Sequence, residues 1–169
     1  MLHLPLKKTE KMDLKKCLFR FVEMAYSTQQ AEDHNNAFKD VDKLRERVRQ
    51  LEHSEKDGEA GENVRELAKY HRLLTTMQSR FTLEGEEGTG TGEWATFTWN
   101  DAIRANDKVS RSELSFEAAC VLFNLAAALS YSATLEDRTT PTGLRAACQA
   151  FQCAREREQA GLLMRVIGG

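Results

Sequence analysis

The histidines and cysteines are the side chains of this sequence that could ligate a transition metal, and their spacing does not favour it. The histidines are His3, His34, His53 and His71, and the cysteines are Cys17, Cys120, Cys148 and Cys153. Structural zinc sites draw on closely spaced Cys and His pairs, and zinc proteases on an H-E-x-x-H helix. Neither pattern occurs here. We therefore predict no metal site and interpret the cysteines as free thiols, as is typical of a reducing compartment.

A glycine-rich run from Gly88 to Gly92 is the segment that could cradle a phosphate group. A working phosphate loop follows a strand, opens a helix and ends in Gly-Lys-Ser/Thr, whereas this run lacks a lysine and precedes a predicted strand. We interpret it as a loop. No Gly-x-Ser-x-Gly elbow is present, and the acidic residues fall on charged helix faces, where we expect solvated carboxylates. The sequence predicts no enzyme, no cofactor and no small-molecule substrate.

The first twenty residues carry the strongest charge asymmetry of the chain. Their cations are Lys7, Lys8, Lys11, Lys15, Lys16 and Arg20, interrupted by Glu10 and Asp13. A basic residue near an anionic membrane contributes about 1 kcal/mol of binding. Weak membrane contact through Lys7, Lys8, Lys15 and Lys16 is one hypothesis, and a solvated helix face is the other. The net charge of the whole chain is −2, which gives no general attraction for nucleic acid.

Length and composition indicate one helix-rich domain or part of one. The chain has 169 residues, of which 41% are hydrophobic and only 2 are proline. Helical spacing of apolar residues predicts helices from about residue 13, over 35–52 and over 60–77, the last two packing as an antiparallel hairpin. The break between them falls at residues 56–58.

The second half of the chain combines a strand with long helices. Residues 94–99 favour a strand, and a small sheet with the extended N-terminal arm at residues 2–6 is expected. Ser110 and Glu113 predict a capping box, and Thr140 followed by Pro141 predicts the start of another helix. The stretch Ala118 to Leu135 has no charged side chain. Its many alanines and its Ser and Thr residues favour the central helix of a bundle over a membrane span.

Four segments follow one another in an order that matches a known domain family. They are 4–9 (Leu-Pro-Leu-Lys-Lys-Thr) with Asp13-Leu14, 97–102 (Phe-Thr-Trp-Asn-Asp-Ala), 114–128 (Leu-Ser-Phe-Glu-Ala-Ala-Cys-Val-Leu-Phe-Asn-Leu-Ala-Ala-Ala), and Gly143-Leu144 leading to Phe151-Gln152. Together they resemble the Bro-one homology (BRO) domain of Alix, rhophilin and the yeast vacuolar-sorting and pH-response scaffolds. The resemblance extends from residue 2 to about residue 154.

This resemblance implies a mainly α fold: a curved helical scaffold with tetratricopeptide-like helix pairs and a small N-terminal β-sheet. It implies a non-catalytic scaffold of the endosomal sorting (ESCRT) pathway, cytoplasmic and recruited to endosomes. Its partner would be the C-terminal amphipathic helix of an ESCRT-III subunit, laid in an apolar groove. One apolar contact position of the family aligns with Leu144, and its helical neighbours Ala147 and Cys148 would line the same edge. Packing of Leu144 in the core is the alternative.

The chain also departs from the family pattern. A BRO domain is more than twice this long, so the resemblance implies that residues 1–154 are the N-terminal part of such a domain, truncated, and that 155–169 are a divergent tail. An alternative exon or a misplaced gene boundary would produce such an end. Pro141 stands where some relatives carry an acidic residue, so their salt bridge is not expected here. Two other functional interpretations remain open: a rhophilin-like or pH-signalling adaptor, and a truncated product without independent activity.

Overall fold

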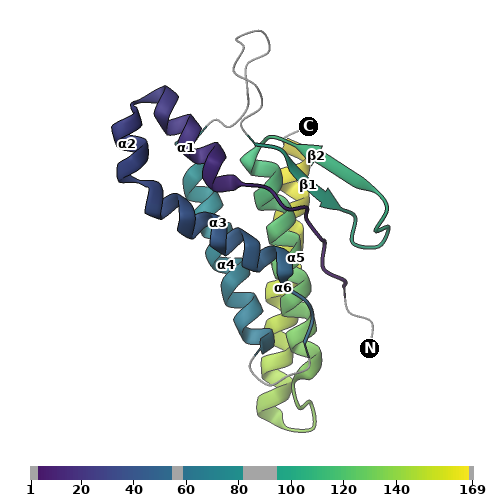
Figure 1. Cartoon of the computed structure of the whole chain (residues 1–169). Coiled ribbons are helices and arrows are strands. Elements are labelled where there is room, and N and C mark those ends of the chain that lie inside the picture. The colour runs from purple at the N-terminus through teal and green to yellow at the C-terminus, as the bar shows by residue number, and fades with distance from the viewer. Residues whose placement is uncertain (1–3, 55–58, 82–94, 168–169) are drawn as a thin grey trace.

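The computed structural model describes residues 4–54, 59–81 and 95–167, with side chains described as far as residue 157 (Figure 1). The predicted loop at 88–92 and the predicted break at 56–58 lie outside these residues. The described elements, in chain order, are α1 (Leu14–Ala25), α2 (Thr28–Asp33), α3 (Asn35–Gln50), α4 (Glu59–Gln78), β1 (Phe97–Asn100), β2 (Lys108–Arg111), α5 (Leu114–Leu135) and α6 (Pro141–Ile167). The predicted mainly α fold with a small sheet is confirmed.

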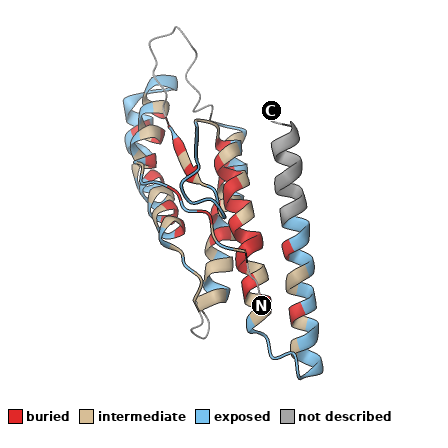
Figure 2. Cartoon of the chain, turned by 90° about the vertical axis from the view of Figure 1, so that its right-hand side faces the viewer, coloured by how far each residue is buried: buried red, intermediate tan, exposed pale blue. Residues whose placement is uncertain are grey.

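Helix α5 is the central element, because α4 packs along it on one side and α6 along another (Figure 2). Its length and composition would allow it to cross a membrane, but most of its apolar stretch is buried inside the protein. Small side chains such as Ala126 and Ala127 let the neighbouring helices approach closely. Most of α5 is buried, as expected of the central helix of a bundle, and residues such as Phe116, Phe123 and Ser130 are only half-buried.

The N-terminal helices form a layer against α4. In α1 the buried residues Leu14, Leu18 and Val22 recur every four positions and give one apolar stripe. Asp13 caps α1 by accepting from the Lys16 backbone N–H at 2.8 Å. Asp42, on α3, accepts from the Leu14 N–H at 2.9 Å. Both carboxylates satisfy amides that the first turn of a helix leaves without partners, and Asp42 also fixes α1 on α3.

The sheet is an antiparallel hairpin in which Phe97 of β1 pairs with Arg111 of β2. The N-terminal arm joins its other edge, as predicted, but through residues 8–10: the Asn100 N–H donates to the Lys8 carbonyl and the Glu10 N–H to the Thr98 carbonyl. The prediction that Ser110 caps the following helix is wrong. Ser110 lies in β2, with its hydroxyl 2.8 Å from that of Thr98.

Helix α5 therefore begins later than the capping box predicted, with Glu113 as N-cap and no side-chain cap bond. The predicted start of α6 is confirmed, because the Gly143 N–H donates to the Thr140 hydroxyl at 3.1 Å. From Pro141 the helix runs unbroken to Ile167. It thus crosses residue 155, where the sequence predicted the start of a divergent tail.

A buried asparagine of α5 holds the arm against the core. The Asn124 side chain accepts from the Lys7 backbone N–H at 2.7 Å and donates to the Lys7 carbonyl at 2.9 Å. One amide side chain thus satisfies both backbone groups of a residue that has no strand partner at this point.

Replacing Asn124 by Ala should release the arm. The two Lys7 backbone groups would lose their buried partners, and we expect a loss of about 1–3 kcal/mol in the free energy of unfolding. Trypsin should then cleave after Lys7 and Lys8 faster than in the parent protein, as followed by mass spectrometry. Asn36→Ala, at an exposed position of α3, is the matched control. Equal cleavage rates in the two variants would contradict the assignment.

Candidate functional site

A fully buried charged network lies between α5, the arm and the sheet. Glu117 is 0% and Arg45 2% exposed, and the Arg45 Nε donates to Glu117 Oε1 at 3.0 Å. The Tyr70 hydroxyl donates to the same oxygen at 3.0 Å, and the Trp99 indole N–H donates to Oε2. Sequence reasoning expected solvated carboxylates, and for Glu117 this is wrong.

The same arginine reaches the arm. Its Nη1 donates to the Glu10 carbonyl at 3.1 Å and its Nη2 to the Thr9 hydroxyl at 3.0 Å. Burial raises the pKa of Tyr70 well above its usual value, and the neighbouring Glu117 carboxylate raises it further. Every charged group of the network has a partner, as buried charges require. The network thus fixes α3, α4, β1 and the arm on α5, and it explains the position of the sheet.

The predicted partner-binding residues lie on the first turns of α6. Leu144 is 50% exposed and Cys148 is exposed. Together with the half-buried Phe151 they recur at i, i+4 and i+7, and these three residues form what we call the α6 stripe. Ala147 is only 2% exposed. Its prediction as a contact residue is therefore wrong, because it lies on the side of α6 that packs on α5. Phe151 was not predicted, although its spacing from Leu144 signals it.

The predicted basic residues do not form one surface. Lys7 is only 8% exposed, with its ammonium 3.6 Å from Asp101 and over the ring of Phe123, so its prediction as a membrane-facing residue is wrong. Lys8 bonds to the Leu51 carbonyl. Lys7 and Lys8 both form ion pairs. The other two predicted residues, the half-buried Lys15 and the exposed Lys16 of α1, form none in the described structure.

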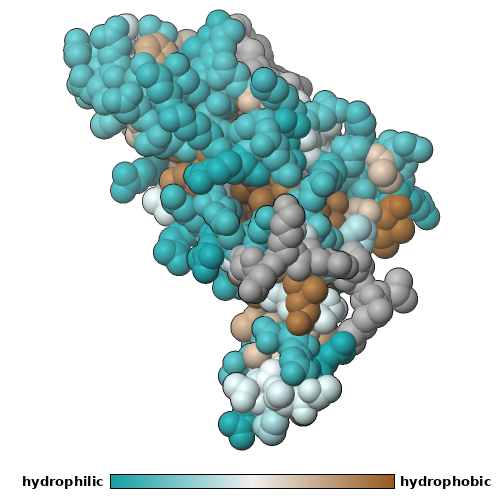
Figure 3. Space-filling view, turned by 60° about the horizontal axis from the view of Figure 1, so that its bottom comes forward, coloured by the Kyte–Doolittle hydropathy of each residue, from teal (hydrophilic) through white to brown (hydrophobic). Residues whose placement is uncertain are grey.

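Other candidate chemistry is sparse in the described part of the chain. No group of three His, Cys, Asp or Glu side chains there could hold a metal ion. All four cysteines are free thiols, and burial raises the pKa of Cys17, so its thiol is a poor nucleophile. The face shown in Figure 3 is mostly hydrophilic, with hydrophobic residues in small separate groups. The buried polar groups described above hold elements of the fold together.

This helical layer with its small sheet matches a defined domain class. The family model of the BRO1-like domain matches residues 1–156, and the chain belongs to that family. ALG-2 interacting protein X of Dictyostelium discoideum is 30% identical over 155 residues, which cover 91% of this chain and 18% of that protein. Vacuolar-sorting protein BRO1 of Arabidopsis thaliana is 29% identical over 148 residues, or 88% of this chain and 17% of that protein.

Solved structures share the fold. The ALIX BRO1 structure in complex with CHMP4C superposes with a TM-score of 0.76 at 25% identity and covers 93% of this chain and 44% of its own. A Bro1 domain structure described as the basis for endosomal targeting has a TM-score of 0.67 at 25% identity, covering 90% and 41%. The chain spans less than a fifth of the length of the two curated relatives above.

Proposed function

We propose that this protein is a non-catalytic interaction scaffold of the endosomal sorting pathway, cytoplasmic and recruited to endosomes. In this role it binds the C-terminal amphipathic helix of an ESCRT-III subunit. Family membership supports the scaffold role, and the similarity to a BRO1 structure in complex with CHMP4C supports the kind of partner. The recruitment is supported by the likeness to a Bro1 domain structure concerned with endosomal targeting.

The observation that carries the proposal is the α6 stripe. Leu144 is half exposed to solvent. Cys148 and Phe151 lie beside it on the same side of the helix and continue the row. An amphipathic helix packs on such a row through its own i, i+3 and i+4 apolar residues. Neither Leu144 nor Cys148 is buried by the rest of the described structure, so both are available to a partner.

The test is a titration of the whole chain into a fluorescently labelled ESCRT-III C-terminal helix, followed by anisotropy. Leu144→Asp should weaken binding by at least ~2 kcal/mol, or about thirtyfold, because it would place a charge in the apolar contact. Gln149→Asp is the matched control, since it adds the same charge at an exposed position on another face of α6. Equal affinity of the two folded variants, or no binding by the folded parent chain, would reject the proposal.

A further inference from the structure

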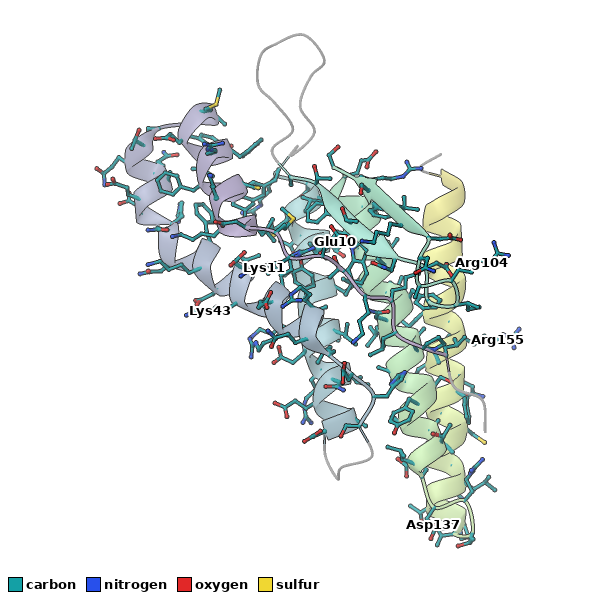
Figure 4. The ribbon with its side chains drawn as sticks, turned by 45° about the vertical axis from the view of Figure 1, so that its right-hand side comes forward. Glu10, Lys11, Lys43, Arg104, Asp137 and Arg155 are labelled. Atoms are coloured by element: carbon teal, nitrogen blue, oxygen red, sulfur yellow. The ribbon has the colours of Figure 1, made fainter. Side chains whose placement is uncertain are left out.

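The turn between α5 and α6 presents a threonine hydroxyl at the surface. Thr140 is exposed. Its hydroxyl donates to the Asp137 carbonyl at 3.1 Å and accepts from the Gly143 N–H at 3.1 Å, and both partners belong to the turn and the first residues of α6. The turn lies at one end of the molecule, where Figure 4 labels Asp137. A large enzyme can therefore approach this hydroxyl from solvent.

Pro141 keeps Thr140 outside the helix. The residue before a proline is disfavoured in the helical region, because its backbone N–H and its Cβ collide with the proline ring. Helix α6 accordingly begins at Pro141 and leaves Thr140 in the turn. Thr140-Pro141 is the only pair of a hydroxyl residue and a following proline in the sequence. A threonine followed by proline in an exposed turn is the kind of substrate that proline-directed protein kinases select.

We propose that Thr140 is a phosphorylation site of a proline-directed kinase, and that its phosphate weakens the binding of the partner helix to the α6 stripe. The effect on binding rests on the function proposed above. In the reaction the Thr140 Oγ attacks the γ-phosphorus of ATP. A new P–O bond forms as the bond to ADP breaks, and the hydroxyl proton passes to a base of the kinase.

The modified oxygen lies one helical turn from the α6 stripe. The Leu144 N–H donates to the Thr140 carbonyl at 2.9 Å, and residues four apart lie on the same face of a helix. A phosphate group carries a charge of about −1.5 to −2 at pH 7. A partner that covers Leu144 would have to remove water from this charge. That cost opposes an apolar contact.

Phosphorylation also changes the turn itself. An esterified Oγ has no hydrogen to donate, so the bond to the Asp137 carbonyl is lost. The Asp137 carboxylate, which accepts from the Thr139 N–H and hydroxyl, repels a phosphate three residues away. The first-turn amides of α6 attract it instead. The phosphate is therefore directed toward α6 and its stripe.

The first test is to incubate the whole chain with a mitogen-activated protein kinase and MgATP and to locate the phosphate by mass spectrometry. We expect it on Thr140. Pro141→Ala should lower the rate of incorporation by about tenfold or more, because it removes the recognised proline and keeps the hydroxyl. Thr139→Val is the matched control. It removes an exposed hydroxyl that no proline follows, and it should be modified like the parent chain.

The second test compares the phosphorylated and unphosphorylated chains in the anisotropy titration with the labelled helix. We expect about tenfold weaker binding after phosphorylation, and phosphatase treatment should restore the parent affinity. Equal affinity of the two forms, a phosphate located elsewhere, or equal modification of Pro141→Ala would overturn the proposal. No binding by either form would reject the proposed function and the effect on binding with it, and the mass spectrum alone would then decide whether Thr140 is the modified residue.

Discussion

Replacing Glu117 by Ala should lower the free energy of unfolding by about 3–5 kcal/mol in a urea titration. The substitution would leave the Arg45 guanidinium buried without its counter-charge, and it would remove the acceptor of the Tyr70 hydroxyl and the Trp99 indole. The free energy of unfolding of a native domain is only about 5–15 kcal/mol. We therefore expect the variant to be close to the limit of folding at 37 °C.

The matched control is Glu52→Ala, which breaks the ion pair with Lys8 where the Glu52 side chain is 80% exposed. It should change stability by less than about 0.5–1 kcal/mol. The double variant Arg45→Ala/Glu117→Ala should cost clearly less than the sum of the two single changes, because it leaves no unpaired charge. Additive costs, or a Glu117→Ala cost as small as that of Glu52→Ala, would contradict the network.

Replacing Gly143 by Ala should destabilise the turn between α5 and α6. A Cβ at this position would lie 2.0 Å from the Asp137 carbonyl oxygen and 2.8 Å from the carbon. That carbonyl also accepts from the Thr140 hydroxyl at 3.1 Å, so it cannot move without disturbing the cap of α6. The turn forms one end of the molecule (Figure 4). We expect a loss of about 2–3 kcal/mol, measured by thermal and urea unfolding.

For Gly61→Ala, which is the same chemical change at another position, we predict the opposite effect on stability. Gly61 is exposed in α4, and a Cβ there meets nothing within 4 Å. Alanine should raise stability by about 0.5–1 kcal/mol, because it favours the helix over the unfolded chain. If both substitutions stabilise the protein, the close approach at Gly143 is not a constraint in solution.

The sequence was sufficient to predict every described helix except the short α2, because burial in this protein follows helical spacing. Leu14, Leu18 and Val22 are buried where the period places them, and α5 is mostly buried because it is apolar around most of its circumference. The cap at Thr140 was predictable for a local reason, since Thr-Pro acts within one turn. Patterns whose physical cause lies within a few residues were therefore predicted well.

The features that sequence reasoning missed depend on contacts between distant segments. No residue close to Glu117 in the sequence shows that Arg45 neutralises its charge. Likewise, no residue close to Lys7 shows that Asn124 binds its backbone and Asp101 its ammonium group. Ser110 has the local signature of a helix cap, but pairing with β1 overrides it. In the candidate site, being close to Leu144 on the same helix did not predict whether a side chain is exposed. Ala147 faces α5, whereas Cys148, one residue later, faces outward.

The contact between Lys7 and Asn124 joins positions 117 residues apart, and the ion pair of Arg45 and Glu117 joins positions 72 apart. A ribosome adds about 5–20 residues per second, so roughly 6–23 s separate the synthesis of the arm from that of the asparagine that holds it. During this interval the arm and Arg45 lack their native partners. The arm is made before the helices that hold it, yet it reaches its place only after α5 has left the exit tunnel.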